Sequence, residues 1–174
     1  MENPMPAAAR WEQWFLAANR WVLVVLVAVM AALVIANVIS RYVFLHSFTW
    51  VEEASRYLMI WTAFLGAGLA LRVGGHIAVD SLQQALPPQG ARWLRALLVA
   101  IVGTTLVALT WLGLEYAQFG WEQETPVLGW SFGMVYLAIP IGALLMLVHL
   151  VLIARGWIAT GQWEHVEGFD PQAL

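Results

Sequence analysis

Residues 21–40 read WVLVVLVAVMAALVIANVIS, a run that lies between Arg20 and Arg41 and contains no charged side chain. About 20 apolar residues in an α-helix span the roughly 30 Å hydrocarbon core of a bilayer. The composition agrees, because 61% of the 174 residues are hydrophobic and only 11% are charged. So few charges cannot cover the surface of a water-soluble domain of this length. The sequence therefore predicts an integral membrane protein.

Three later stretches of the chain are similarly long, apolar and poor in charge. The four expected transmembrane spans are 21–40, 50–74, 90–117 and 131–154. The second span is preceded by Thr49, and Glu52 follows three residues later, a pattern typical of a capped helix N-terminus. Apolar residues at helical spacing also predict short amphipathic surface helices at 10–19 and 80–86. The expected fold is a single all-α membrane domain over residues 1–174.

The arginines predict the orientation of the domain. Four spans place both termini on one side of the membrane. That side carries six of the eight arginines, Arg10, Arg20, Arg72, Arg92, Arg95 and Arg155, and the other side carries Arg41 and Arg56. Basic residues on short loops favour the cytoplasmic side. Both termini are therefore expected in the cytoplasm.

The composition also excludes several classes of function. A net charge of -3 provides no basic surface for nucleic acid, and the absence of cysteine excludes thiol catalysis and cysteine-ligated metal sites. The sequence contains no nucleophile–base pair, glycine-rich phosphate loop or carboxylate pair that would indicate an enzyme. The apolar cores of the four spans hold no charged residue, so an ion-coupling site within this chain is not expected.

The histidines leave one alternative open. His76 closes the second span, and His149 lies one to two turns before Arg155, so both are expected near the same membrane face. Two histidines placed in this way can ligate a b-type haem axially. A haem-bearing membrane anchor of an electron-transfer complex is therefore the alternative to a protein that has no cofactor.

The second span carries the most informative cluster of polar residues. Glu52 and Glu53 precede Arg56 by one helical turn, so their charges can compensate each other at the start of the helix. The same cluster could instead form a docking point for a second protein. Further along, a face of small side chains would let another helix approach closely; its members are Ala63, Gly66, Ala67 and Ala70. Pro140 in the fourth span predicts a kink.

Several motifs together resemble one family of membrane proteins. They are Trp50-x-Glu52-Glu53-x-x-Arg56-Tyr57-x-x-x-Trp61-x-x-Phe64-Leu65-Gly66, Arg72-x-Gly74-x-His76-Ile77-x-Val79-Asp80, Thr125-Pro126-x-Leu128 and Ala138-Ile-Pro140-Ile-Gly142. This pattern, which extends from about Arg20 to Arg155, resembles the small membrane subunit, of the DctQ type, of tripartite ATP-independent periplasmic (TRAP) transporters. The spacing of the paired glutamates, the histidine and the aspartate is its most specific part.

The resemblance implies a non-catalytic subunit in the inner membrane of a bacterium. Its stable partner would be a large membrane subunit that holds the transport pathway, and a periplasmic binding protein would bring an organic acid such as a dicarboxylate or sialic acid. An ion gradient would drive uptake. The residues expected at the partner interface are Trp50, Glu52, Glu53, Arg56, Trp61, Gly66, Ala70, His76, Asp80 and Pro140.

Overall fold

The computed structural model describes residues 7–72 and 86–161. Its helices are α1 (Ala7–Val43), α2 (Thr49–Arg72), α4 (Pro88–Phe119), α5 (Phe132–Tyr136) and α6 (Ala138–Thr160). Four segments are long and apolar enough to cross a membrane, namely Trp11–Val43, Thr49–Arg72, Pro88–Phe119 and Phe132–Thr160. Within the described ranges, the only pairing of the strand type is an isolated bridge between Glu124 and Ser131. The expected all-helical fold with four possible spans is confirmed.

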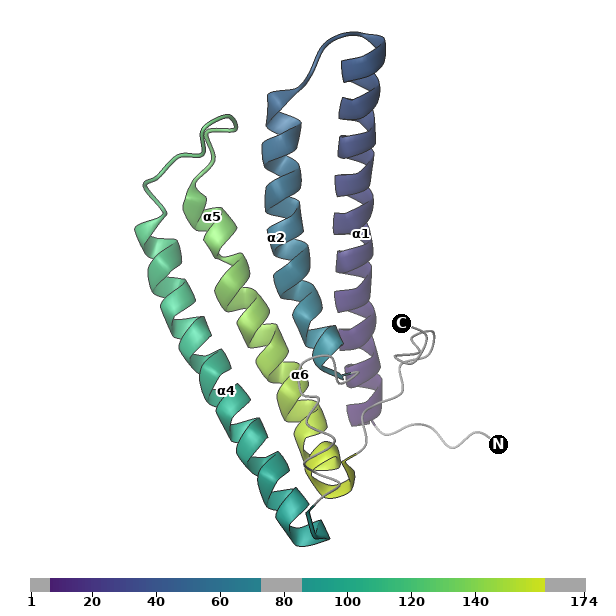
Figure 1. Cartoon of the computed structure of the whole chain (residues 1–174), viewed down its shortest axis with the longest axis vertical. Helices are drawn as coiled ribbons and strands as arrows, with labels where there is room; N and C mark the ends of the chain where they lie inside the picture. Colours follow the sequence, from purple (N-terminus) through teal and green to yellow (C-terminus); the bar gives the residue numbers. More distant parts are fainter. Residues whose placement is uncertain (1–6, 73–85, 162–174) are drawn as a thin grey trace, which may run out of the picture.

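The long helices form an open layer in the order α1, α2, α6, α4 (Figure 1). α6 packs between α2 and α4. Among the described helices, the backbone of α1 lies close only to that of α2. One end of the layer, called the turn end below, carries the α1–α2 and α4–α5 connections; α1 begins and α6 ends at the opposite, terminal end. Because α1 and α4 do not close the layer into a bundle, many large apolar side chains stay exposed on its faces and edges.

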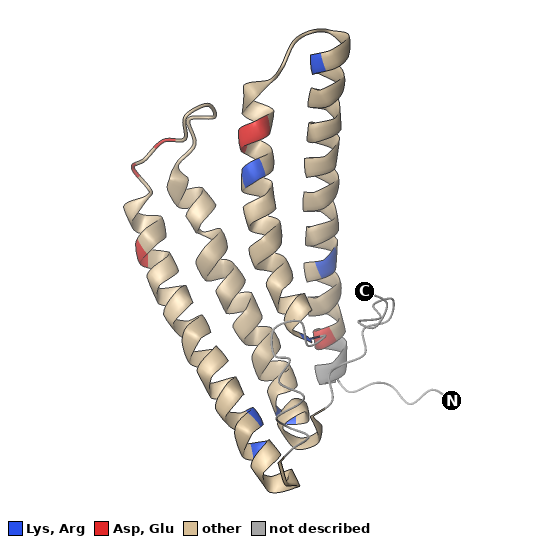
Figure 2. Cartoon of the chain, viewed as in Figure 1, with Lys and Arg blue, Asp and Glu red and all other residues tan. Residues whose placement is uncertain are grey.

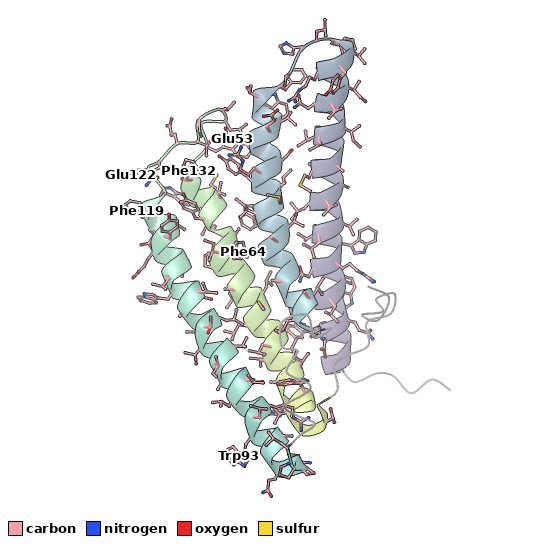
Figure 3. All side chains as sticks on the ribbon, viewed as in Figure 1. Glu53, Phe64, Trp93, Phe119, Glu122 and Phe132 are labelled. Carbon is pink, nitrogen blue, oxygen red and sulfur yellow. The ribbon has the colours of Figure 1, made fainter. Side chains whose placement is uncertain are left out.

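The hydrophobic core lies where α4 and α6 meet, with one contribution from α2. Its buried members are Leu71, Leu106, Ala143, Leu150, Ile153 and Trp157. α2 and α6 approach each other closely at Gly142, where a Cβ atom would lie only 2.7 Å from the carbonyl oxygen of Phe64. Figure 3 shows Phe64 at this junction between the two helices. The absence of a side chain at Gly142 therefore allows the close packing of α2 on α6.

α1 contacts its neighbour through one narrow stripe. Between residues 19 and 40, its buried or half-buried positions alternate at spacings of four and three, and they are Asn19, Leu23, Leu26, Met30, Leu33, Asn37 and Ser40. Such a seven-residue repeat keeps a single seam of a helix against one partner. The rest of this stretch of α1 is exposed, including its run of valine and isoleucine side chains.

The expected surface helix at 10–19 is wrong as a separate element, because α1 continues through it without a break. The stretch between Ala7 and Val43 contains no glycine or proline that would end a helix. Asn19 is also buried on the stripe that faces the other helices, so packing has already begun before Arg20. Residues 80–85 of the second expected surface helix lie outside the described residues.

The fourth span is interrupted between α5 and α6. Proline has no amide hydrogen, and its ring crowds the carbonyl group four residues earlier. For Pro140 that carbonyl belongs to Tyr136, the last residue of α5. Leu137 separates the two helices, and α6 resumes at Ala138. The interruption is confined to Leu137, whose backbone keeps the α-helical conformation, and the kink expected at Pro140 stays a prediction.

Candidate partner interface

Glu53 is buried and makes its contacts inside the chain. Its carboxylate accepts a hydrogen bond from the hydroxyl of Tyr57, one turn along α2, at 2.7 Å. It also accepts one from the backbone N–H of Val127 in the α4–α5 loop, at 2.9 Å. Figure 3 shows Glu53 beside that loop. Glu53 therefore ties the loop to α2, and this contact differs from the pairing with Arg56 that its spacing predicts.

Glu52 points in another direction and closes the turn between α1 and α2. Its carboxylate forms an ion pair with Arg41, the basic residue in the last turn of α1. Arg41 also donates to the hydroxyl of Ser47 at 3.0 Å. Deeper in the turn, the side-chain oxygen of Asn37 accepts the backbone N–H of Phe48 at 2.8 Å. The glutamate expected to cap α2 thus joins two helices instead.

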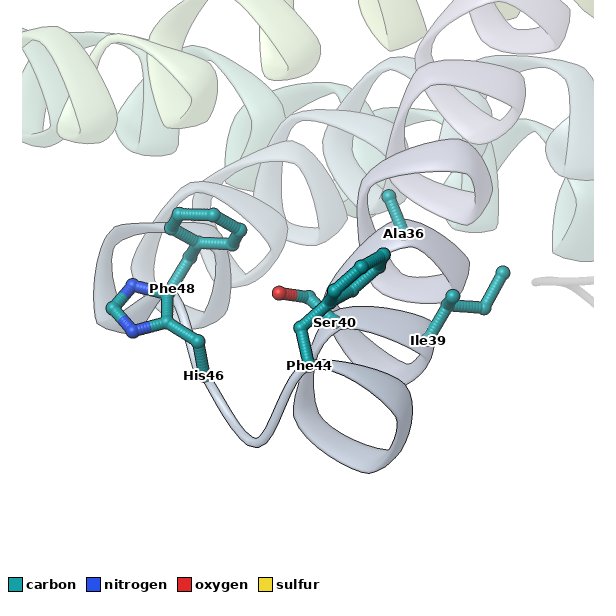
Figure 4. A pocket seen from close by; sticks show the side chains of 6 residues that line it. All are labelled: Ala36, Ile39, Ser40, Phe44, His46 and Phe48. Carbon is teal, nitrogen blue, oxygen red and sulfur yellow. The ribbon is translucent and has the colours of Figure 1, made fainter.

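A shallow apolar groove lies at the same turn (Figure 4). Its lining residues are Ala36, Ile39, Ser40, Phe44, His46 and Phe48. The rings of His46 and Phe48 meet edge to face, with 4.9 Å between their centroids. The groove carries no charged side chain, in keeping with a position beside a bilayer.

One strip of α2 remains exposed on the surface of the layer. We call it the α2 strip, and it comprises Glu52, Arg56, Met59 and Ala63, which follow each other at spacings of four, three and four. Trp50 is also exposed, by 42%. Trp61 is half-buried. The α2 strip therefore presents a polar end near the α1–α2 turn and a small apolar end near mid-helix.

Three other expected interface residues lie against this chain's own helices or beside them. A Cβ atom on Gly66 would lie 3.7 Å from Leu23 of α1, so the small face of α2 already receives α1 at that point. Pro140 is buried next to α4, where its ring faces Gly113. Ala70 is half-buried. The remaining two, His76 and Asp80, lie outside the described residues.

A buried polar network at the terminal end was not predicted from the sequence. Arg72 is fully buried, although a terminal arginine of a span is expected to lie in a loop. Its Nη2 atom lies 2.7 Å from a carboxylate oxygen of Glu12 on α1. Its Nε atom donates to Nδ1 of His149 on α6 at 2.9 Å. The network therefore connects α1, α2 and α6.

His149 completes the network and does not fit the haem alternative. Its ring is fully buried, its Nδ1 atom accepts from Arg72, and its Nε2 atom is hydrogen-bonded to the side-chain amide of Asn19 at 3.2 Å. Phe15 covers the ring, with 4.8 Å between centroids. An axial haem ligand needs a free ring nitrogen that faces the iron. Both nitrogens of His149 are engaged in hydrogen bonds to Arg72 and Asn19, so neither is free to face an iron.

On α4 and the loop that follows it, acidic and basic residues lie at opposite ends of the layer (Figure 2). The exposed acids Glu115, Glu122 and Glu124 lie toward the turn end, on α4 and on the loop that follows it. Arg92 and Arg95 lie at the opposite end of α4, in its first two turns. The layer is therefore polarised along its long axis.

Known proteins resemble this chain over most of its length. The family "Tripartite ATP-independent periplasmic transporters, DctQ component" matches residues 30–159. A putative TRAP transporter small permease protein of Haemophilus influenzae is 36% identical over 75% of this chain and 80% of the relative. The ectoine TRAP transporter small permease protein TeaB of Halomonas elongata is 30% identical over 68% of this chain and 63% of the relative.

A longer relative matches over a small part of its own length. The isethionate TRAP transporter permease protein DctMQ of Oleidesulfovibrio alaskensis is 29% identical over 63% of this chain but over only 18% of that permease. The family match covers well over half of the 174 residues, and four helices of the structure are long enough to cross a membrane. The chain therefore belongs to the DctQ family and is a small permease subunit of a TRAP transporter.

Proposed function

We propose that this chain is a non-catalytic brace for the large membrane subunit of its transporter. The single observation that carries the proposal is the open layer of helices. α1 and α4 do not meet in the described structure, so neither wide face of the layer is closed by the chain itself. A partner membrane protein that lies along one face would complete the packing, and the layer would hold it in place.

We place that partner against the α2 strip. Ala63 is exposed, and the strip continues toward the half-buried Ala70, so a helix of the large subunit can approach closely at Ala63. At the turn end, Trp50 and Arg56 offer an aromatic ring and a guanidinium at the expected depth of the headgroups. Trp61, which is half-buried, lies in the sequence between Arg56 and Ala63.

A non-catalytic role is supported by three buried ionisable groups, because each of them holds parts of this chain together. Glu53 holds the α4–α5 loop, and Arg72 and His149 join helices to one another. None of these groups is left to bind and release an ion. The relatives carry the names of different substrates, ectoine and isethionate, which supports selection of the substrate by other subunits. We therefore assign the organic acid, such as a dicarboxylate or sialic acid, to those subunits.

The partner follows from the longer relative. A match over 18% of the isethionate permease supports a small component that works beside a much larger permease component. In the proposed complex, the large subunit holds the transport pathway and an ion gradient drives uptake. A periplasmic binding protein would approach the turn end, where Glu122 and Glu124 are exposed. The chain would lie in the inner membrane of a bacterium, with both termini in the cytoplasm.

Co-purification of variants tests the brace. Ala63→Trp places a large ring on the α2 strip, and Ala108→Trp places the same ring on an exposed position of α4. We expect Ala63→Trp to remove a co-expressed large subunit from the purified complex, because a lipid chain can yield to the ring but a packed helix cannot. Ala108→Trp is expected to keep the complex intact.

Uptake in proteoliposomes provides the second readout. Substrate should accumulate only with both membrane subunits, the binding protein and an ion gradient, and Ala63→Trp should abolish this uptake. If Ala63→Trp leaves both co-purification and uptake unchanged, the α2 strip is not the interface. Uptake by the large subunit and the binding protein without this chain would contradict the brace itself.

A further inference from the structure

The apolar groove at the α1–α2 turn has a hydroxyl group on its floor, that of Ser40 (Figure 4). This residue is only 9% exposed, and its oxygen points into the space between the rings of Phe44 and Phe48. Among the described residues, no hydrogen bond involves this hydroxyl. A polar group in apolar surroundings costs free energy unless a hydrogen bond compensates it. The groove therefore fits an apolar ligand that carries a hydrogen-bonding atom.

Backbone hydrogen bonds hold the walls of the groove in place. The carbonyl oxygen of Ser40 accepts from the N–H groups of Phe44 at 3.0 Å and His46 at 3.2 Å. The side chain of Asn37 accepts from the N–H group of Phe48 at 2.8 Å. The volume of the groove is about 560 Å³, within the range of sites that bind small molecules. The groove is therefore formed before any ligand arrives.

The groove crosses the boundary between the hydrocarbon core of the membrane and its headgroups. Arg20 and Arg41 lie 21 residues apart in α1, which is about 31 Å along the helix and matches the thickness of the hydrocarbon core. Ser40 directly precedes Arg41 at one edge of this core. Ala36 lies one turn deeper, whereas His46 lies beyond the end of α1. The ester groups of a phospholipid occupy the same boundary, between the acyl chains and the headgroup.

The surroundings of the groove favour a lipid that has no net charge. The lining residues carry no formal charge, and Arg41 and Glu52 beside the turn compensate each other. Large apolar side chains of the same turn are exposed, among them Phe44 and Leu45, the latter by 89%. Contiguous exposed apolar surface marks a contact with a membrane or with another protein. A transmembrane helix uses its backbone carbonyls internally, whereas the ester carbonyl of a lipid is free to accept from Ser40.

We propose that the groove binds one acyl chain of a phospholipid without net charge, and that the hydroxyl of Ser40 donates a hydrogen bond to the ester carbonyl of that chain. The chain passes Ala36 and Ile39, and the headgroup lies near His46. The α2 strip does not line the groove, so this site does not depend on the proposed contact with the large subunit.

Native mass spectrometry of the full chain, released from detergent, tests the hydrogen bond. Two phosphatidylcholines with identical chain lengths are titrated, one with ester-linked and one with ether-linked chains, so that only the first has the carbonyl groups. We expect the wild-type chain to bind the ester lipid about fivefold more tightly, the typical effect of one hydrogen bond. Ser40→Ala should bind both lipids equally, with the affinity that the wild type has for the ether lipid.

A pair of alanine substitutions tests the groove itself. Ala36→Phe fills the groove with a ring, and we expect the affinity for the ester lipid to fall at least tenfold. Ala28→Phe is the matched control, because Ala28 is also an exposed alanine of α1 but lies outside the groove. This variant should keep the wild-type affinity. Circular dichroism should show the same helix content for both variants.

Several results would overturn the proposal. Equal binding of the two lipids by the wild-type chain would show that Ser40 does not contact an ester, and this comparison decides the matter even if a variant does not fold. Equal losses in Ala36→Phe and Ala28→Phe would mean that lipid covers α1 without a defined site. If Ala36→Phe releases a co-expressed large subunit but binds lipid as the wild type does, the groove is a protein contact. The α2 strip is tested separately by Ala63→Trp.

Discussion

The ring of His149 is enclosed by side chains from three helices. Arg72 of α2 and Asn19 of α1 bond its two nitrogens, and Phe15 of α1 packs on its face. On its remaining side lies Gly68 of α2, where a Cβ atom would come within 2.3 Å of the Cδ2 atom of the ring. The imidazole therefore fills the space that the side chain of any other residue at position 68 would need. Gly68 is as much part of the network as the two residues that bond the ring.

Gly68→Ala should consequently destabilise the protein, although alanine is the better helix former. The added methyl group would push the ring away from Arg72 and Asn19, and overpacking of this kind costs about 1–3 kcal/mol. Gly156→Ala is the control, because a Cβ atom on Gly156 meets nothing within 4 Å, and it should be neutral or stabilise by up to about 1 kcal/mol. Thermal unfolding in detergent measures both. Equal Tm values for the two variants would contradict this role of Gly68.

The attachment of α1 depends on polar contacts near both of its ends. Its seam is a single stripe, and apolar stripes alone drive helix association weakly in a bilayer, because lipid tails are as apolar as leucine. At the turn end, Arg41 pairs with Glu52 and Asn37 accepts a backbone hydrogen bond. At the terminal end, Glu12 pairs with the buried Arg72. These contacts fix the register of α1 on α2.

Arg72→Gln should therefore release the first half of α1 while the second half stays in place. Loss of one partner from a buried ion pair costs about 3 kcal/mol or more, and the low end applies here because Glu12 is partly exposed. Hydrogen exchange should become faster over residues 12–23 and remain slow over residues 30–40. Arg20→Gln removes an exposed arginine from α1 itself, and hydrogen exchange should stay unchanged in both of these regions of α1. Uniformly faster exchange across α1 would show that the network does not act locally.

The helices were predictable from the sequence because each coincides with a long stretch that is poor in charge. The continuity of α1 through 10–19 could not be predicted, since the amphipathic pattern there fits a helix on the membrane surface as well as a helix packed against other helices. The contacts of Glu53 and Arg72 were also missed. Local spacing pairs Glu53 with Arg56, but the observed partners include Val127, 74 residues away. Arg72 lies near the predicted end of the second span, where local spacing offers it no partner, because only the tertiary packing of α6 provides His149, which lies 77 residues from it.

At the scale of the whole molecule, the two ends of the layer differ in charge. The exposed acids of α4 and the following loop lie toward the turn end, and Arg92 and Arg95 lie at the terminal end. Basic residues at the end of a span favour the cytoplasmic side, whereas acidic residues have little effect. The terminal end is therefore expected in the cytoplasm and the turn end in the periplasm. This orientation also places the turn end within reach of a binding protein.

Single cysteines test this orientation without background, because the chain contains no cysteine of its own. Glu122→Cys places a thiol on the exposed α4–α5 loop, and Gln89→Cys places one in the first turn of α4. A thiol reagent that cannot cross the inner membrane should label Glu122→Cys in intact cells, and it should label Gln89→Cys only after that membrane is opened. The reverse pattern would invert the topology. Labelling of both cysteines in intact cells would mean that α4 does not cross the membrane, which would contradict the four-span arrangement as a whole.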